Sequence, residues 1–199
     1  IELILQENGI PDDFKYLAVI ESGLTHVTSP AGAEGFWQFM PQTARDYGLE
    51  VNGDIDERLH LIKATESATA YLKDAYSEFG NWTLAAAAYN AGVQRIKTSL
   101  EEQQTNSYYG LFLNEETSRY MYRMLATKLI FKSPESYGFL IPKAQTYPFP
   151  KTKLIKVSTS PIDWVAFAKS QNMSYADLRE INPWIKGYKF SNRNNKEYE

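Results

Sequence analysis

The apolar positions of the first two thirds of the chain recur at helical spacing. The Pro-Asp-Asp sequence at 11–13 is typical of a first helical turn, because proline needs no N–H partner there and acids face the positive end of the helix. A helix is therefore predicted to start near residue 11. Within it Phe14, Leu17, Ala18 and Glu21 fall at positions i, i+3, i+4 and i+7. This pattern places an acid, Glu21, on the face that is predicted to be buried.

Further helices follow from the same periodicity and from local start and stop signals. Residues 1–11 have the character of a helix end, and Pro41 opens a short helix that Gly48 can close. The alanine-rich segment 83–92 forms another helix, with Asn90 and Gly92 suited to its exit. Two longer helices are predicted from apolar stripes, one at Ala68, Leu72, Ala75, Tyr76 and Phe79 and one, after an acidic turn, at Tyr120, Met121, Met124, Leu125 and Leu129. Together these segments predict a compact α domain.

The pattern changes after about residue 138, where three prolines and scattered lysines prevent a continuous helix. A strand is predicted at 153–157, two short helices at 161–172 and 174–182, the second with Ser174 as N-cap, and a returning strand at 187–190. The fold class is therefore α+β, with a mainly α domain over 1–140, a proline-rich linker over 141–152 and a small βααβ module over 153–191. The polar tail, 192–199, is expected to be frayed.

Composition removes several classes of function. A net charge of −3 with interspersed signs predicts no binding to nucleic acid, and no apolar stretch reaches the roughly 20 residues of a membrane helix. The absence of cysteine excludes disulfides and thiolate chemistry, and two histidines are too few for most zinc sites, so we expect no metal and no cofactor. We expect a soluble chain with further sequence ahead of residue 1, since neither an initiator Met nor a basic leader is present.

Glu21 then allows two interpretations. An acid on an apolar stripe commonly reaches solvent or pairs with Lys or Arg. An acid that is buried for function instead has a raised pKa, holds its proton near neutral pH and can act as a general acid. Cleavage of a glycosidic bond requires such a group, because the leaving oxygen must receive a proton as the transition state forms.

Four motifs around Glu21 favour the second interpretation. They are Glu21-Ser22, the Gly-rich run from Gly32 to Pro41, Ala-Tyr-Asn-Ala-Gly at 88–92, and Glu-Thr-Ser-Arg-Tyr at 116–120. In this order and spacing the chain resembles the lytic transglycosylases of the goose-type-lysozyme superfamily, specifically the membrane-bound murein transglycosylase D kind, over residues 1 to about 140. The resemblance implies a lysozyme-like catalytic domain.

The resemblance implies that Glu21 is the single catalytic acid and base of peptidoglycan cleavage between N-acetylmuramic acid and N-acetylglucosamine. In the family the glutamate protonates the glycosidic oxygen, the muramic N-acetyl group assists, and the glutamate then takes the C6 hydroxyl proton as a 1,6-anhydro ring closes. An internal nucleophile needs no second carboxylate. Asp46, Asp54 and Asp56 are available as such a partner, although helix-end and loop roles are favoured for all three.

The other motif residues are candidates for substrate binding. Each role implied by the resemblance has a structural alternative. Gln38 lies in the cleft or at a solvent-facing helix entry, and Tyr89 lies beside the acid or in the core. Ser29 donates a hydrogen bond to the acid or serves only in a turn. Asn90 is a binding residue or a helix terminator, and Glu116, which looks buried, either organises the site or faces the helix dipole. The remaining candidates are Ser22, Met40 and Tyr120, and core packing is expected for at least two of Phe36, Trp37, Phe39 and Met40.

The C-terminal module resembles a degenerate LysM domain, a βααβ module that binds N-acetylglucosamine chains. The segment 177–185 carries the match, close to the usual Leu-x-x-x-Asn-Pro ending. The Gly-Asp-Thr turn expected after the first strand is replaced by residues 158–163. The module is therefore predicted either to bind glycan or only to brace the catalytic domain.

Three functional classes follow. The leading one is a lytic transglycosylase acting on peptidoglycan glycan strands, expected to be a monomer in the periplasm or envelope of a Gram-negative bacterium, with room for a membrane anchor ahead of residue 1. The alternatives are a hydrolytic goose-type lysozyme, which requires a base carboxylate opposite Glu21, and a non-catalytic peptidoglycan-binding scaffold. The joint presence of Glu21, Gln38, Tyr89 and Glu116 disfavours the scaffold.

Overall fold

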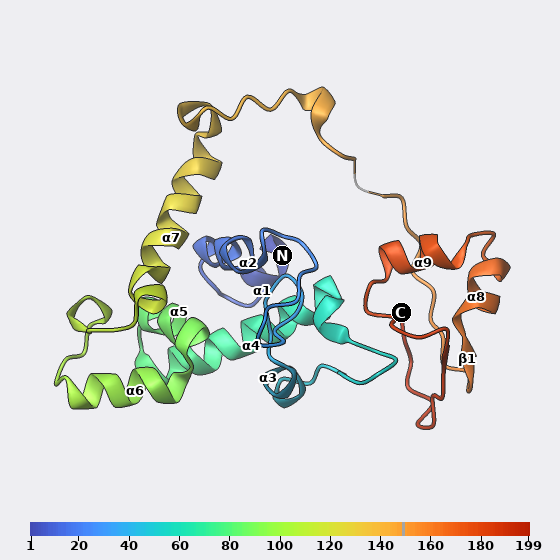
Figure 1. Ribbon diagram of the computed structural model, residues 1–199, viewed down its shortest axis with the longest axis horizontal. Helices are drawn as coiled ribbons and strands as arrows, with labels where there is room; N and C mark the ends of the chain where they lie inside the picture. The colour runs from blue at the N-terminus through green and yellow to red at the C-terminus, as the bar shows by residue number, and fades with distance from the viewer. Residues whose placement is uncertain (149) are drawn as a thin grey trace.

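A computed structural model describes residues 1–148 and 150–199 as a helical body and a small mixed module (Figure 1). The body and its connecting segments contain α1 (Glu2–Glu7), a 3₁₀ turn at Asp12–Phe14, α2 (Lys15–Ser22), α3 (Pro41–Asp46), a 3₁₀ turn at Glu57–Leu59, α4 (Leu61–Phe79), α5 (Trp82–Ala91), α6 (Val93–Glu102), a 3₁₀ turn at Tyr108–Gly110, α7 (Glu115–Lys132), and 3₁₀ turns at Pro134–Tyr137 and Lys143–Gln145. The module contains β1 (Ile162–Asp163), α8 (Trp164–Ser170), α9 (Tyr175–Ile181) and β2 (Lys189–Phe190). The α+β class with a dominant helical part is confirmed.

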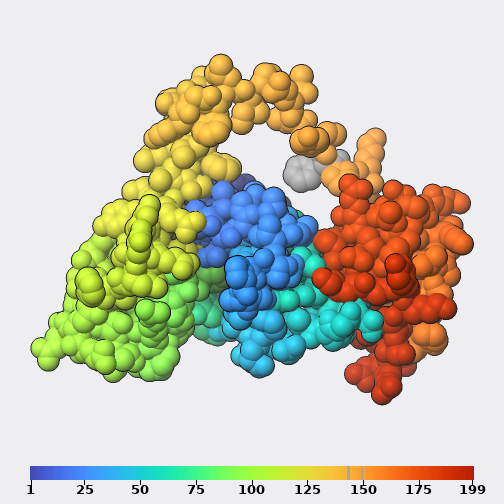
Figure 2. All heavy atoms as spheres, viewed as in Figure 1, coloured from blue at the N-terminus to red at the C-terminus, as the bar shows by residue number. Residues whose placement is uncertain are grey.

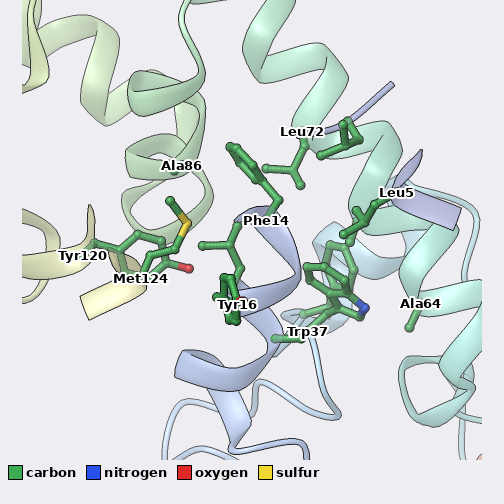
Figure 3. Close-up of a cluster of buried hydrophobic side chains, with 14 of the residues drawn as sticks. Leu5, Phe14, Tyr16, Trp37, Ala64, Leu72, Ala86, Tyr120 and Met124 are labelled. Carbon is green, nitrogen blue, oxygen red and sulfur yellow. The ribbon is translucent and has the colours of Figure 1, made fainter. Parts of the chain in front are cut away.

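The main core surrounds α2. Phe14, Leu17 and Ala18 are buried as the stripe predicts, and they pack with Leu5 of α1, with Trp37 and with side chains of α4, α5 and α7 (Figure 3). The helix ends at Gly23, which adopts a left-handed conformation with φ of +61° that a larger residue takes at a cost. Helix α2 therefore lies at the centre of the body, with its last turn beside α7.

A second core lies between α4, α5, α6 and α7. Alanines 85–88 of α5 are fully buried, and such small side chains allow the neighbouring helices to approach closely. Helix α6 was not predicted from the sequence, because Gly92 reads as a helix end. Gly92 does end α5, at φ +88°, but it also starts α6, whose Val93, Ile96 and Leu100 form a short apolar stripe.

Two predicted stripes are only partly buried. Ala68, Leu72 and Ala75 of α4 are in the core, but Tyr76 is exposed and stacks on Trp82 at a ring separation of 4.2 Å. On α7, Tyr120 and Met124 are buried while Leu125 and Leu129 are exposed. The reason is that α7 extends past its neighbours toward the segment that arches over the body (Figures 1 and 2), so its second half has fewer surfaces to pack against.

The C-terminal module has its helices where the sequence predicts them. Ser174 caps α9 in a capping box with Asp177, and β2 falls inside the predicted returning strand. The strand predicted at 153–157 is wrong: β1 starts at Ile162 and pairs antiparallel with β2. In the predicted segment only Val157 pairs, and its partner is Tyr198.

The expectation that the tail is frayed is also wrong. Tyr198 and Asn192 are buried, and Lys196 forms ion pairs with Glu50 and Glu57 of the helical body. A polar composition favours fraying only when nothing pairs with the polar groups. Here the body supplies the partners.

The module packs against the segment 54–59 of the body. Ile55 and Leu59 belong to the apolar cluster of the module, together with Trp184 and Ile185. No helix in the described part of the chain is both long enough and apolar enough to cross a lipid bilayer.

Candidate active site

Glu21 lies in the last turn of α2, where its carboxylate meets α7. The phenol of Tyr120 donates a hydrogen bond to Glu21 Oε1 over 2.5 Å. Glu21 and Tyr120, which are far apart in the chain, are thus in contact as hydrogen-bond acceptor and donor.

Burial raises the pKa of Glu21 above its ordinary value. The hydrogen bond from Tyr120 and the positive charge of Arg123 oppose this shift, while the negative charge of Glu116 adds to it. The net direction is upward, so the protonated form of Glu21 persists to higher pH than in an exposed glutamate. This is the property that a general acid needs.

Two phenols near the carboxylate remain protonated. Burial is the main cause that raises the pKa of both Tyr89 and Tyr120 well above the ordinary value, and the charge of Glu21 adds to each shift. Tyr89 donates to the carbonyl oxygen of Trp37 over 2.7 Å. Its hydroxyl therefore holds the Gly-rich loop, and its ring packs edge-on against Trp37 and Phe39.

The loop over residues 32–40 carries Gln38 in an unusual conformation. Gln38 has a φ of +49°, which is uncommon for a residue other than glycine. Its side-chain nitrogen donates to the carbonyls of Val27 and Gly35 over 2.9 and 2.8 Å. With both amide protons used inside the protein, the carbonyl oxygen is the part of this amide available to a ligand.

The aromatic residues of this loop divide between core and surface. Trp37 and Phe39 are buried, which confirms the expectation of core packing for at least two of the four. Phe36 is half-buried beneath the stacked ring of His26, and Met40 is exposed.

Ser22 and Ser29 have local structural contacts. Ser22 Oγ donates to the carbonyls of Ala18 and Phe36, both at 3.0 Å, and so ties α2 to the loop. Ser29 Oγ accepts the backbone N–H of Ala33 over 3.0 Å. Within the described part of the chain Ser29 has no hydrogen bond to Glu21, so the turn interpretation fits this conformation and the bond to the acid does not form.

Asn90 and Glu116 come together at the start of α7. The Asn90 side-chain nitrogen donates to Glu116 Oε1 over 3.0 Å, and its oxygen accepts the Thr117 hydroxyl over 2.8 Å. Asn90 lies inside α5, which continues to Ala91, so it does not end that helix and instead joins α5 to α7. Glu116 is exposed, contrary to its buried appearance in the sequence, because the first turn of α7 lies at the surface.

Arg123 is a site residue that the sequence reasoning missed. It affects the pKa of Glu21 and donates to the carbonyl of Ile20 over 2.9 Å. With Glu115, Glu116 and Arg119 it lines a groove along α7. The helical spacing of Glu116, Tyr120 and Arg123, at i, i+4 and i+7, is the signal in the sequence that could have identified Arg123, because it puts all three on one face.

The aspartates considered as second carboxylates are occupied elsewhere. Asp56 forms a buried ion pair with Arg58 and caps the 3₁₀ turn at 57–59, and Asp46 accepts the side-chain amide of Gln42 on α3. Asp54 lies in the turn that contacts the C-terminal module. These contacts agree with the helix-end and loop roles favoured from the sequence.

Comparison with known proteins shows the family of this chain. The sequence model described as "Transglycosylase SLT domain" matches residues 2–112, and the one described as "Soluble lytic transglycosylase C-terminal LysM-like domain" matches 153–199. The membrane-bound lytic murein transglycosylase D of Escherichia coli K12 is 30% identical over 190 residues, covering 92% of this chain and 41% of the relative. The chain therefore spans about two fifths of the length of that curated relative.

Two solved structures share the fold. The 70 kDa soluble lytic transglycosylase SLT70 of E. coli superposes with a TM-score of 0.55 at 27% identity, covering 67% of this chain and 24% of that chain. An inactive mutant of the lytic transglycosylase Slt from Pseudomonas aeruginosa superposes with a TM-score of 0.52 at 23% identity, covering 72% and 25%. Because the first family model matches more than half of the residues, the chain belongs to the transglycosylase SLT domain family and carries a LysM-like C-terminal domain.

Proposed function

We propose that this chain is a lytic transglycosylase that cleaves the β-1,4 bond between N-acetylmuramic acid and N-acetylglucosamine in peptidoglycan without consuming water. The observation that carries the proposal is the pairing of Glu21 with Tyr120, in which a half-buried carboxyl group has a raised pKa and a fixed orientation. Family membership supports the substrate class, since the curated relative is named a murein transglycosylase.

Glu21 acts first as an acid and then as a base. It gives its proton to the glycosidic oxygen as the bond from muramic C1 to that oxygen breaks, and the muramic N-acetyl group supports the developing positive charge. The C6 hydroxyl oxygen then bonds to C1 while its proton passes to Glu21. The glutamate regains its starting state, and the products are an N-acetylglucosamine end and a 1,6-anhydromuramic end.

The neighbouring groups support this cycle. Tyr120 can donate to Glu21 in its ionised state, which is the intermediate state of the cycle. Arg123 stabilises the same charge from the next turn of α7. Gln38, with its free carbonyl oxygen, and Met40, which is exposed, are the loop residues best placed to contact sugar.

The second carboxylate that most glycosidases use has no buried candidate beside Glu21 in the described residues. Glu116 is the acid whose charge reaches Glu21, but it is exposed and bonded to Asn90. This arrangement favours an internal nucleophile over a water activated by a second acid. The proposed setting is the envelope of a Gram-negative bacterium, with glycan strands as the partner.

The test is mass spectrometry of the soluble muropeptides that the protein releases from purified sacculi, beside a Glu21→Gln variant. Products lighter than the hydrolysis products by the mass of one water, and absent with the variant, are expected. Products with hydrated reducing ends would make the protein a lysozyme. No product that depends on Glu21 would turn the assignment to a scaffold.

A further inference from the structure

We propose that Arg58 is a positioning residue for the active site, and that the C-terminal module holds it in place. This inference rests on the proposed function for its effect on catalysis. It gives the module a role in the reaction that does not depend on glycan binding by the module.

Arg58 joins the two ends of the Gly-rich loop. Its Nη1 atom donates to the carbonyl of Gly32 over 2.8 Å and to that of Phe39 over 3.0 Å. These two residues flank the turn that carries Gln38. One buried guanidinium thus closes the loop at its base.

The backbone of Arg58 also meets the middle of the loop. A Cβ atom placed on Gly35 would lie only 2.2 Å from the Arg58 carbonyl oxygen, so the two main chains are in direct contact. Gly35 has a φ of +77°, and its carbonyl accepts the side chain of Gln38. The position of residue 58 therefore determines where the loop lies and how Gln38 is held.

Asp56 fixes the guanidinium. Nε and Nη2 of Arg58 donate to the two carboxylate oxygens of Asp56 over 2.9 and 2.8 Å, and both side chains are 7% exposed. A buried arginine needs this paired geometry, because an unpaired charge away from water is costly. With Nη1 on the loop and two other nitrogens on Asp56, the guanidinium has a single orientation.

The C-terminal module fixes Asp56. The Asp56 N–H donates to the Trp184 carbonyl over 2.9 Å, and Ile55 pairs with Ile185 in an antiparallel bridge. In addition, Glu57 pairs with Lys196 of the tail over 3.1 Å. Residues 55–57 thus contact the module and Arg58 contacts the active-site loop, so movement of the module is passed to the loop through one short segment.

The loop is anchored to the catalytic helices on its other side. Ser22, next to Glu21, donates to Phe36, and Tyr89 donates to Trp37. The loop therefore lies between the acid and Arg58. Loss of the Arg58 contacts leaves the contacts with Ser22 and Tyr89 in place but allows Gly32, Gln38 and Phe39 to move relative to Glu21. Displacements of about 1 Å in an active site can lower the reaction rate about a hundredfold.

The test compares Arg58→Lys with Arg45→Lys, each in the whole 199-residue chain, by hydrogen exchange and by kinetics. Lysine keeps the charge but lacks the planar fork. Arg45 is the matched control, because it donates to the carbonyl of Val51 and not to the loop. Two loop amides report on the loop itself, since the N–H groups of Glu34 and Gln38 donate to the carbonyls of Phe39 and Gly35 within it.

We expect exchange across 32–40 to become at least about tenfold faster in Arg58→Lys, with α4 and α5 as protected as before. The kcat for 1,6-anhydro products from soluble glycan strands is expected to fall about tenfold to a hundredfold, and more than any change in KM. Arg45→Lys is expected to match the unmodified chain in both measurements. Unchanged exchange across 32–40, or equal effects of the two variants, would overturn the inference.

A second pair of variants tests the contribution of the module. Ile185→Ala weakens the contact with Ile55, while Leu178→Ala opens a space in the same apolar cluster on α9. Faster exchange across 32–40 is expected for Ile185→Ala and not for Leu178→Ala, and equal behaviour would contradict the role of the module. Fast exchange throughout α4 and α5 would reveal that Arg58→Lys does not fold. In that case the Ile185→Ala and Leu178→Ala pair still tests whether the module holds the loop.

The two proposals fail in different ways. If the unmodified chain yields no product that depends on Glu21, the proposed function is wrong, and exchange across 32–40 still decides whether Arg58 holds the loop. If the unmodified chain is active and Arg58→Lys is equally active, only the inference about Arg58 is wrong.

Discussion

The hydroxyl group of Tyr120 lies 2.5 Å from the carboxylate of Glu21, although 99 positions separate the two residues in the chain. Helix α7 must therefore be packed on α2 before the acid has its donor. This contact and the charge of Arg123 lower the pKa of Glu21 against the effect of burial, while the charge of Glu116 raises it further. Each of these groups leads to an expected outcome.

Tyr120→Phe removes the donor and leaves the ring. The hydrogen bond from Tyr120 lowers the pKa of Glu21, so its loss raises that pKa further and the acid form persists to higher pH. We expect the alkaline limb of kcat/KM to move to higher pH, and kcat to fall by about tenfold or more because the carboxyl group is less well oriented. A pH–rate profile on soluble glycan strands checks both, and a limb that moves to lower pH would contradict the assigned role.

Arg123→Gln and Glu116→Gln should move the same limb in opposite directions. Arg123 lowers the pKa of Glu21 and Glu116 raises it, so removing the arginine charge shifts the alkaline limb up and removing the glutamate charge shifts it down. Added salt should reduce both differences, because exposed charges are screened. The two profiles serve as controls for each other, and a common direction would show that charge is not the cause.

Glu21→Gln is expected to stabilise the fold at neutral pH. The folded pKa of Glu21 is raised, so its protonated form contributes stability at low pH that is lost as the pH rises through the folded pKa. Glutamine has no charge to desolvate and can still accept from Tyr120. The free energy of unfolding is expected to rise by about 0.5–2 kcal/mol when the buried charge is removed, which corresponds to a rise of a few degrees in Tm.

Thermal unfolding at pH 8 and pH 4 measures this effect. The variant should melt at a higher temperature than the unmodified chain at pH 8, and the two should converge at pH 4, where Glu21 is protonated. A lower Tm for the variant at pH 8 would mean that burial does not dominate at this carboxyl group.

Gly35→Ala is expected to be strongly destabilising, and Gly32→Ala much less so. Both glycines have a positive φ, of +77° and +88°, and both variants therefore incur a backbone cost of about 1–2 kcal/mol. Only at Gly35 does the added methyl also meet a main chain, at 2.2 Å from the Arg58 carbonyl oxygen, whereas no atom lies within 4 Å of the corresponding position at Gly32.

Urea unfolding should show a total loss of about 2–5 kcal/mol for Gly35→Ala. Gly32→Ala should show only the backbone part of that loss. Equal losses for the two variants would mean that the contact between the loop and Arg58 is not tight in solution.

Local patterns in the sequence predicted most of the helices. Pro41 starts α3, Ser174 caps α9, and the stripe of Phe14, Leu17 and Ala18 marks the buried face of α2. These signals depend on neighbours within about one helical turn, so they can be read along the chain. Helix α6 was missed for the same local reason, because a glycine that ends one helix can also begin the next.

Burial beyond one turn was less predictable. Leu125 and Leu129 continue the stripe of Tyr120 and Met124, yet they are exposed because α7 extends past the helices that cover its first half. The strand expected at 153–157 formed only one bridge, at Val157, because its partner is Tyr198 in the tail and not the returning strand. Periodicity identifies a face, and only tertiary contacts decide what covers it.

The sequence by itself determined the helical body, the order of the motif residues and the presence of an acid on a buried face. The tertiary structure alone decided that Tyr120 meets Glu21, that Glu116 is exposed and bonded to Asn90, and that Arg58 reaches from the module contact to the Gly-rich loop. Helix signals arise from hydrogen bonds and side-chain contacts between residues three or four apart. The contacts of the site join residues tens of positions apart, and they form only when separate elements pack into one arrangement.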